Sequence, residues 1–321
     1  MKFEKGVSNM ATTLAERMSK FSGSPTSALI AKVAELKQQG KDIISLNVGE
    51  PDFGTPDYIK VAGMKAIADN FTKYTPGNGI LELRQEIVKK LKQDNGIEYG
   101  LNEITTSVGA KQAIASAMMV IAGPGDEVIL PIPCWVSYTE MIRLAGATPV
   151  FVPVRPDNYE LDLKAIEDAI TPRTKAIIIC TPNNPTGAVY SEESLRKLAE
   201  LAVKHDFFIV ADEIYEKLVY DGAKHFSVAS ISQEVKERTV TVNGFSKAYA
   251  MTGWRIGYAA ARPDVIKGIM AVQSQTTSAT SSISQKAAAA ALRGPQHDKE
   301  VMVEEFKGRR NYEVKRLNGV P

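Results

Sequence analysis

Six short apolar runs constrain the fold of this 321-residue chain more than any other feature. They are near-continuous rather than alternating, as in strands that are covered on both faces of a sheet. The runs are residues 127–131, 148–152, 175–180, 207–212, 238–242 and 256–260. Segments with helical periodicity lie around them, at residues 110–121, 136–145, 163–170 and 192–204. This alternation predicts βαβ units, and therefore an α/β fold with a mostly parallel, doubly wound sheet and helices on both faces.

The bulk composition narrows the class of protein. The chain is 44% hydrophobic and 24% charged, which is ordinary for a globular protein. A net charge of +2 gives no reason to expect nucleic acid or an anionic membrane as a partner. The sequence has no signal-like apolar segment and no stretch long enough to span a membrane, so we expect a cytoplasmic protein. Its two cysteines, Cys134 and Cys180, have no His or Cys partner at metal-ligand spacing, which argues against a zinc site.

A lysine follows the fifth apolar run. Lys247 lies in the string NGFSKAYAMTGWRIG at residues 243–257, eight positions before Arg255. Burial among apolar neighbours removes hydration from an ammonium, which lowers its pKa and makes a nucleophilic amine accessible near neutral pH. The arginine could hold a phosphate nearby. Taken alone, Lys247 is more simply explained as a solvated loop lysine.

Other polar or aromatic residues follow strand ends or begin helices. Asp212 ends a very apolar run, where a carboxylate is costly to bury unless it meets a cation. Asn184 lies in a rigid Pro/Gly loop at residues 181–187, and Trp135 follows the first run. Gly109 opens a helix whose free N–H groups could bind an anion. Each has an ordinary structural explanation when taken alone, but ligands of doubly wound sheets bind at the carboxyl ends of strands.

Together these motifs resemble the class I and II aminotransferases, the aspartate aminotransferase family, from residue 47 to residue 257 and in family order. The resemblance implies the fold-type I architecture and the cofactor pyridoxal 5′-phosphate (PLP). It implies that Lys247 forms a Schiff base with PLP, that Asp212 pairs with the pyridine nitrogen, and that Asn184 and Tyr215 contact the ring hydroxyl. The remaining cofactor contacts that it implies are Trp135 stacked on the ring, Gly109, Ala110, Lys111 and Arg255 at the phosphate, Ser246, and Tyr74 from a neighbouring subunit.

The resemblance also implies a reaction. Lys247, Asp212 and Tyr215 are its expected catalytic residues, and Gly49, Trp135 and Asn184 are expected to bind substrate. The reaction is a ping-pong transfer of an amino group from an L-amino acid to a 2-oxo acid. Lys111 favours aspartate with 2-oxoglutarate, with prephenate as a further acceptor, although this lysine could equally neutralise the phosphate. Another PLP reaction, of the C–S lyase or synthase type, and a catalytically impaired homologue are the alternatives.

The domain organisation follows from the same resemblance. We expect an N-terminal arm and small-domain element at residues 1–49, a large PLP-binding domain at 50–296, and the start of a small α/β domain at 297–321. Family members continue further and carry there an arginine for the substrate α-carboxylate. We therefore expect the chain as given, whether a fragment or a natural truncation, to bind PLP weakly or to fold poorly. The role of Tyr74 implies a homodimer with shared active sites.

Overall fold

The computed structural model describes residues 15, 23, 25–46 and 48–320. At its centre is a seven-stranded sheet with the order β1-β7-β6-β5-β4-β2-β3. The strands are β1 (Ile104–Ser107), β2 (Glu127–Ile132), β3 (Thr148–Pro153), β4 (Thr174–Cys180), β5 (Phe208–Asp212), β6 (Thr239–Gly244) and β7 (Gly257–Ala260). The expected mostly parallel sheet is confirmed. The six apolar runs form β2 to β7, and the short strand β1 comes in addition.

Strand direction determines which side chains meet at one edge. Strands β2 to β6 are parallel, with Cys180 opposite Asp212 and Asp212 opposite Val242 at their carboxyl ends. Strand β7 is antiparallel to both β6 and β1, so that β1 runs in the same direction as the others. The loops that follow β1, β2, β4, β5 and β6 therefore leave the sheet at the same edge.

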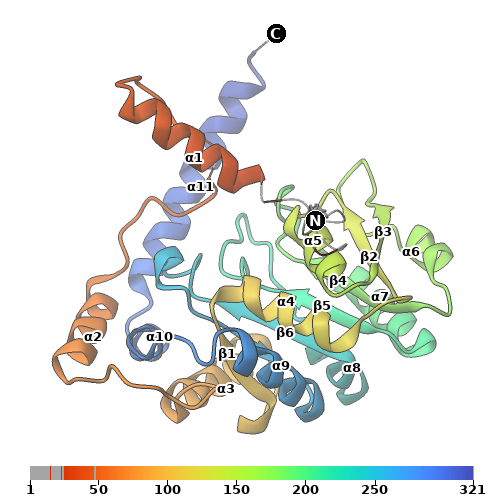
Figure 1. Ribbon diagram of the computed structural model, residues 1–321. Helices are drawn as coiled ribbons and strands as arrows, with labels where there is room; N and C mark the ends of the chain where they lie inside the picture. The colour runs from red at the N-terminus through yellow and green to blue at the C-terminus, as the bar shows by residue number, and fades with distance from the viewer. Residues whose placement is uncertain (1–14, 16–22, 24, 47, 321) are drawn as a thin grey trace, which may run out of the picture.

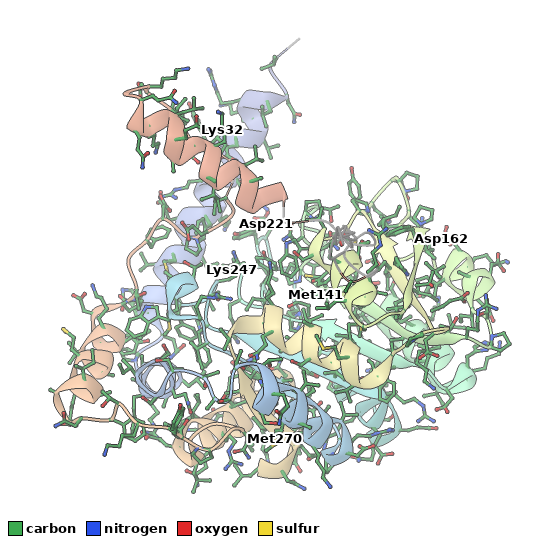
Figure 2. The ribbon with its side chains drawn as sticks, viewed as in Figure 1. Lys32, Met141, Asp162, Asp221, Lys247 and Met270 are labelled. Carbon is green, nitrogen blue, oxygen red and sulfur yellow. The ribbon has the colours of Figure 1, made fainter. Side chains whose placement is uncertain are left out.

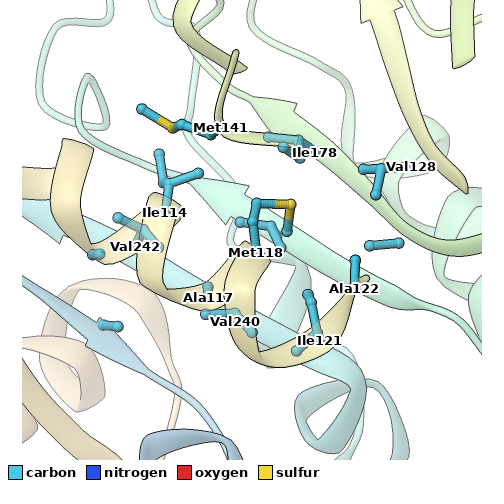
Figure 3. Packing of buried hydrophobic residues seen from close by; sticks show 14 of the residues in the cluster. Ile114, Ala117, Met118, Ile121, Ala122, Val128, Met141, Ile178, Val240 and Val242 are labelled. Atoms are coloured by element: carbon cyan, nitrogen blue, oxygen red, sulfur yellow. The ribbon is translucent and has the colours of Figure 1, made fainter. Parts of the chain in front are cut away.

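Helices cover both faces of the sheet, as the sequence predicts (Figure 1). One face is covered by α4 (Gly109–Ile121), α5 (Ser137–Leu144) and α9 (Pro263–Thr276), and the other by α6 (Leu163–Ala169), α7 (Glu192–His205) and α8 (Gln233–Arg238). Figure 3 shows Ile114 and Met118 of α4 above Val240 and Val242 of β6. Each such fully buried side chain contributes about 1.5–3 kcal/mol relative to exposure.

A third apolar cluster lies at the β1–β7 end of the sheet. It packs α2 (Asp57–Ala68), α3 (Leu81–Asn95) and α10 (Ser282–Arg293) against residues around β7. Helix α3 ends at Asn95, and Gly96 follows it in the left-handed conformation (φ 69°), which favours glycine. Ser191 caps the beginning of helix α7, where its side-chain oxygen accepts a hydrogen bond from the Ser194 N–H.

Two helices extend away from the sheet (Figure 1). They are α1 (Pro25–Gln38) and α11 (His297–Leu317). Leu29 and Ile30 of α1 are exposed, and Met302 is the one buried residue of α11. Much of the predicted N-terminal arm, residues 1–14, 16–22 and 24, lies outside the described residues, as does Asn47. Within the described residues, no helix has the length and apolar character needed to cross a membrane.

Candidate active site

The polar residues predicted from strand ends gather at the carboxyl edge of the sheet. Asp212 ends β5, Asn184 follows β4, and Lys247 follows β6, in strands that are neighbours in the sheet. Figure 2 shows Lys247 at the edge of the sheet, near the end of β6. Three residues that are at least 28 positions apart in sequence are thereby brought into one site by strand pairing alone.

Asp212 is buried, with 3% of its surface exposed. Its Oδ2 accepts a 2.6 Å hydrogen bond from the Tyr138 hydroxyl, and its Oδ1 accepts from the Ile214 N–H. Burial raises the pKa of Asp212 to about 6, although these hydrogen bonds and the charge of Lys247 act in the opposite direction. The carboxyl group is thus placed where a cationic partner would be strongly favoured.

Tyr215 is three residues beyond Asp212, in the turn that follows β5. Its hydroxyl oxygen accepts a 3.3 Å hydrogen bond from Asn184 Nδ2. The Lys247 ammonium lies 5.7 Å from the centre of the Tyr215 ring. The Asn184 amide, the Tyr215 phenol and the Lys247 amine therefore lie close to one another.

Lys247 is half-buried, and its Nζ donates to the Gly49 carbonyl. Burial lowers the pKa of the Lys247 ammonium; Glu50 and Asp212 raise it, whereas Arg255 lowers it further. A lowered pKa increases the fraction of neutral amine, which is the nucleophilic form. The contact with Gly49 also brings the segment before α2 to the site.

The start of α4 forms an anion cradle together with two cations. Gly109 begins the helix at φ 76°, and a Cβ there would lie 2.5 Å from Arg255 Nη2. The Arg255 guanidinium donates to the Thr252 and Val108 carbonyls. No carboxylate among the described residues forms a salt bridge with Arg255 or Lys111, so both remain available to an anion at the helix start.

Lys111 and Trp135 are stacked next to this cradle. The Lys111 Nζ lies 4.8 Å from the centre of the Trp135 ring. Burial and the nearby Arg255 charge lower the pKa of Lys111. The Trp135 ring meets the Tyr138 ring edge to face, with centroids 5.3 Å apart. Trp135 thus lies between the anion cradle and Tyr138, the tyrosine that donates to Asp212.

Comparisons with known proteins show the family of this chain. The sequence model of the family described as aminotransferase class I and II matches residues 41–320. The chain belongs to this family. It is 46% identical over 313 residues to an aspartate aminotransferase from Bacillus sp. (strain YM-2), covering 97% of this chain and 80% of the relative. Members of the class I and II aminotransferases generally depend on PLP.

Two further proteins place the chain within the class I and II aminotransferases. A probable aspartate/prephenate aminotransferase from Aquifex aeolicus (strain VF5) is 46% identical over 315 residues, covering 97% of this chain and 80% of the relative. The structure of a Thermus thermophilus aspartate aminotransferase with maleate superposes with a TM-score of 0.92 at 44% identity, covering 96% of this chain and 80% of that one. This protein is thus an aminotransferase with the fold-type I architecture.

One residue that the sequence singled out lies apart from this candidate site. Tyr74 is 96% exposed, and no hydrogen bond or ring contact joins it to the other described site residues. Ser246, in contrast, lies beside Lys247 and is partly buried. The expected position of Tyr74 in a neighbouring subunit's site concerns a second copy, so its role stays a prediction.

Sequence reasoning missed Tyr138 as a member of the site. It lies in the same short string as Trp135, and only the fold reveals that its hydroxyl reaches Asp212, 74 residues away. The available signal was a single polar aromatic near the beginning of a helix that follows a strand. A tyrosine in that position is more often a packing residue.

Proposed function

We propose that this aminotransferase binds PLP in the site at the carboxyl edge of the sheet and uses Lys247 as its catalytic amine. The observation that carries the proposal is the convergence of Asp212, Asn184, Tyr215 and Lys247 from three neighbouring strands. No two of these residues are joined by local sequence geometry except Asp212 and Tyr215. Bound PLP would supply an electron sink for the negative charge left on the substrate carbon after proton removal.

The described residues fit this cofactor. Its phosphate fits the start of α4, where the absence of a Cβ at Gly109 leaves space against Arg255. Arg255 can bind two phosphate oxygens with its planar fork, and the backbone at Gly109 and Ala110 offers free N–H groups. Lys111 adds positive charge nearby, and Ser246 lies next to the lysine. Trp135, at the edge of the same cradle, would cover one face of the ring.

Asp212 is the proposed partner of a protonated ring nitrogen. Its burial disfavours the charged carboxylate, and a cation at contact distance removes that penalty. Asn184 and Tyr215 together offer an amide N–H and a phenol to a ring hydroxyl. These three side chains would fix the ring's orientation and its charge.

Lys247 has the second task of moving a proton. Because burial lowers its pKa, the amine is more easily neutral when it is free, and it can accept the Cα proton of a bound amino acid. The same Nζ can then return that proton to another carbon within its reach. The Gly49 carbonyl, its acceptor in this structure, restrains the ammonium near the substrate side of the site.

The substrate pair that we propose is aspartate with 2-oxoglutarate, with prephenate as a further acceptor. Lys111 supports an acidic side chain, because it is a cation at the site without a carboxylate partner among the described residues. The finer organisation is part of the same proposal: a homodimer to which Tyr74 contributes from the partner subunit, a cytoplasmic location, and domain boundaries at residues 49/50 and 296/297.

A panel of amino donors tests this function. Aspartate with 2-oxoglutarate should yield oxaloacetate and glutamate with ping-pong kinetics. Lys111→Ala should raise KM for aspartate more than for alanine, whereas Lys175→Ala, at an exposed position near the beginning of β4, should change neither KM. Release of ammonia in place of a new amino acid would instead identify a lyase.

A further inference from the structure

The turn after β5 has two sides. Asp212 and Tyr215 belong to the site, through Tyr138 and Asn184. Each is followed in the chain by a glutamate, Glu213 and Glu216, that has different partners. These two side chains are also buried, with 1% and 7% of their surface exposed. Backbone hydrogen bonds hold the turn itself, from the Glu213 N–H to Val242 O and from the Glu216 N–H to Glu213 O.

Both glutamates contact α3. Asn95 at its end donates through Nδ2 to Glu216 Oε2 at 2.8 Å and to Glu213 Oε2 at 3.2 Å. Lys90, one turn earlier, forms an ion pair with Glu216 and donates to Asn95 Oδ1 at 2.7 Å. The Lys90 side chain is only 10% exposed, so this pair lies largely out of water.

The loop before residue 228 completes the network. The Ser227 hydroxyl donates to Glu213 Oε2 at 2.9 Å, and His225 Nε2 lies 3.3 Å from the same carboxylate. Two buried carboxylates thus face one lysine and one histidine, together with an amide and a hydroxyl. Burial alone would raise the pKa of Glu216, but Lys90 and Lys217 lower it to about 2.

A buried network of this kind costs desolvation energy that an apolar core would avoid. Its distinctive effect is geometric: it holds Glu213 and Glu216 of the turn through partners that lie outside the candidate site. Displacing Glu213 or Glu216 would move Asp212 and Tyr215, because the same short backbone carries all four side chains. Such a displacement need not alter the rest of the sheet.

We propose that Glu213 and Glu216, held by Lys90, Asn95, His225 and Ser227, are positioning residues that set the placement of Asp212 and Tyr215 toward the cofactor. This inference rests on the proposed function. None of these residues belongs to the site that we propose for substrate and cofactor, and they act through the turn that they anchor.

The experiment compares Glu216→Gln and Lys90→Met with Glu103→Gln. Glu103 forms a similarly enclosed pair with Lys236, with side chains 16% and 12% exposed, at the opposite edge of the sheet. Three quantities are measured: the thermal midpoint of the cofactor-free protein, the dissociation constant for PLP, and the pH at which the absorbance of the bound cofactor titrates.

All three variants should lower the thermal midpoint. Only Glu216→Gln and Lys90→Met should weaken PLP binding, by roughly tenfold, and displace the absorbance titration, because small misplacements of reacting groups have large effects. Lys90→Arg keeps the positive charge, so it should retain much of the wild-type PLP affinity and of the wild-type absorbance titration. If Glu216→Gln does not fold, Ser227→Ala removes one donor to Glu213 and provides the same comparison.

Two failures are distinguishable. Wild-type protein that binds no PLP at Lys247 would contradict the proposed function itself. Wild-type protein that binds PLP normally, with Glu216→Gln and Glu103→Gln altered in stability alone, would overturn the positioning role while leaving the function intact.

Discussion

The Tyr138 hydroxyl donates a 2.6 Å hydrogen bond to Oδ2 of Asp212, and both side chains are almost fully buried. Tyr138 belongs to the first turns of α5, whereas Asp212 ends β5. The bond satisfies one carboxylate oxygen and turns the other toward the Ile214 N–H. It therefore fixes the orientation of the group that we propose to pair with the cofactor ring.

Removing that hydroxyl should weaken cofactor binding. A hydrogen bond to a charged group is worth about 1.5–3 kcal/mol, so Tyr138→Phe should reduce PLP affinity by roughly ten- to a hundredfold. Titration of the cofactor-free protein with PLP, followed by protein fluorescence, measures this affinity. Tyr99→Phe is the matched control, since Tyr99 is also buried and its hydroxyl bonds to Thr241 instead. Equal effects of the two variants would contradict the role of Tyr138.

The raised pKa of Asp212 predicts a pH dependence of stability. Its folded pKa of about 6 lies above the ordinary value of 3.8, so the folded, cofactor-free protein holds this proton more tightly than the unfolded chain. The resulting stabilisation is fully present below pH 4 and is lost as the pH rises through 6. Two pKa units correspond to about 3 kcal/mol.

Asp212→Asn should remove this dependence. Urea unfolding without PLP, at several values between pH 4 and pH 7, gives the free energy of unfolding of both proteins. The wild type should lose about 3 kcal/mol relative to the variant across this range. Curves that stay parallel would show that the carboxyl group titrates alike in the folded and unfolded chains.

The contact between Gly109 and Arg255 predicts a steric effect. An added Cβ would meet Arg255 Nη2 at 2.5 Å, so Gly109→Ala must displace the guanidinium as well as strain the backbone at φ 76°. Gly125→Ala imposes a similar backbone strain at φ 94° with no atom within 4 Å of the new Cβ. PLP affinity should fall at least about tenfold in Gly109→Ala alone. A comparable loss in Gly125→Ala would indicate general destabilisation.

The sequence predicts much of this fold because its strands are buried on both faces. Continuous apolar runs mark such strands directly, and the runs agree with β2 to β7 to within about two residues. The direction of β7, in contrast, could not be predicted from the sequence. Its antiparallel pairing with β6 and β1 depends on contacts across the sheet, which its own short sequence does not record.

The candidate site and its surroundings likewise include residues that the sequence predicts and residues that it does not. Asp212 ends a strand, and Asn184 and Lys247 follow strand ends, so the parallel fold places them together once the strands are known. Lys90 and Asn95 could not be predicted, since they lie on a charged helix more than a hundred residues before Glu213 and Glu216. Only the packed structure shows that these side chains share one buried network.

The Schiff base that we propose at Lys247 is tested most directly by reduction of the PLP-loaded protein with borohydride, followed by mapping of the labelled peptide. We expect a single pyridoxyl label on Lys247, and no stable label after Lys247→Ala. A label on Lys111 or on any other amine, or no label on protein that retains its fold, would rule out Lys247 as the catalytic amine.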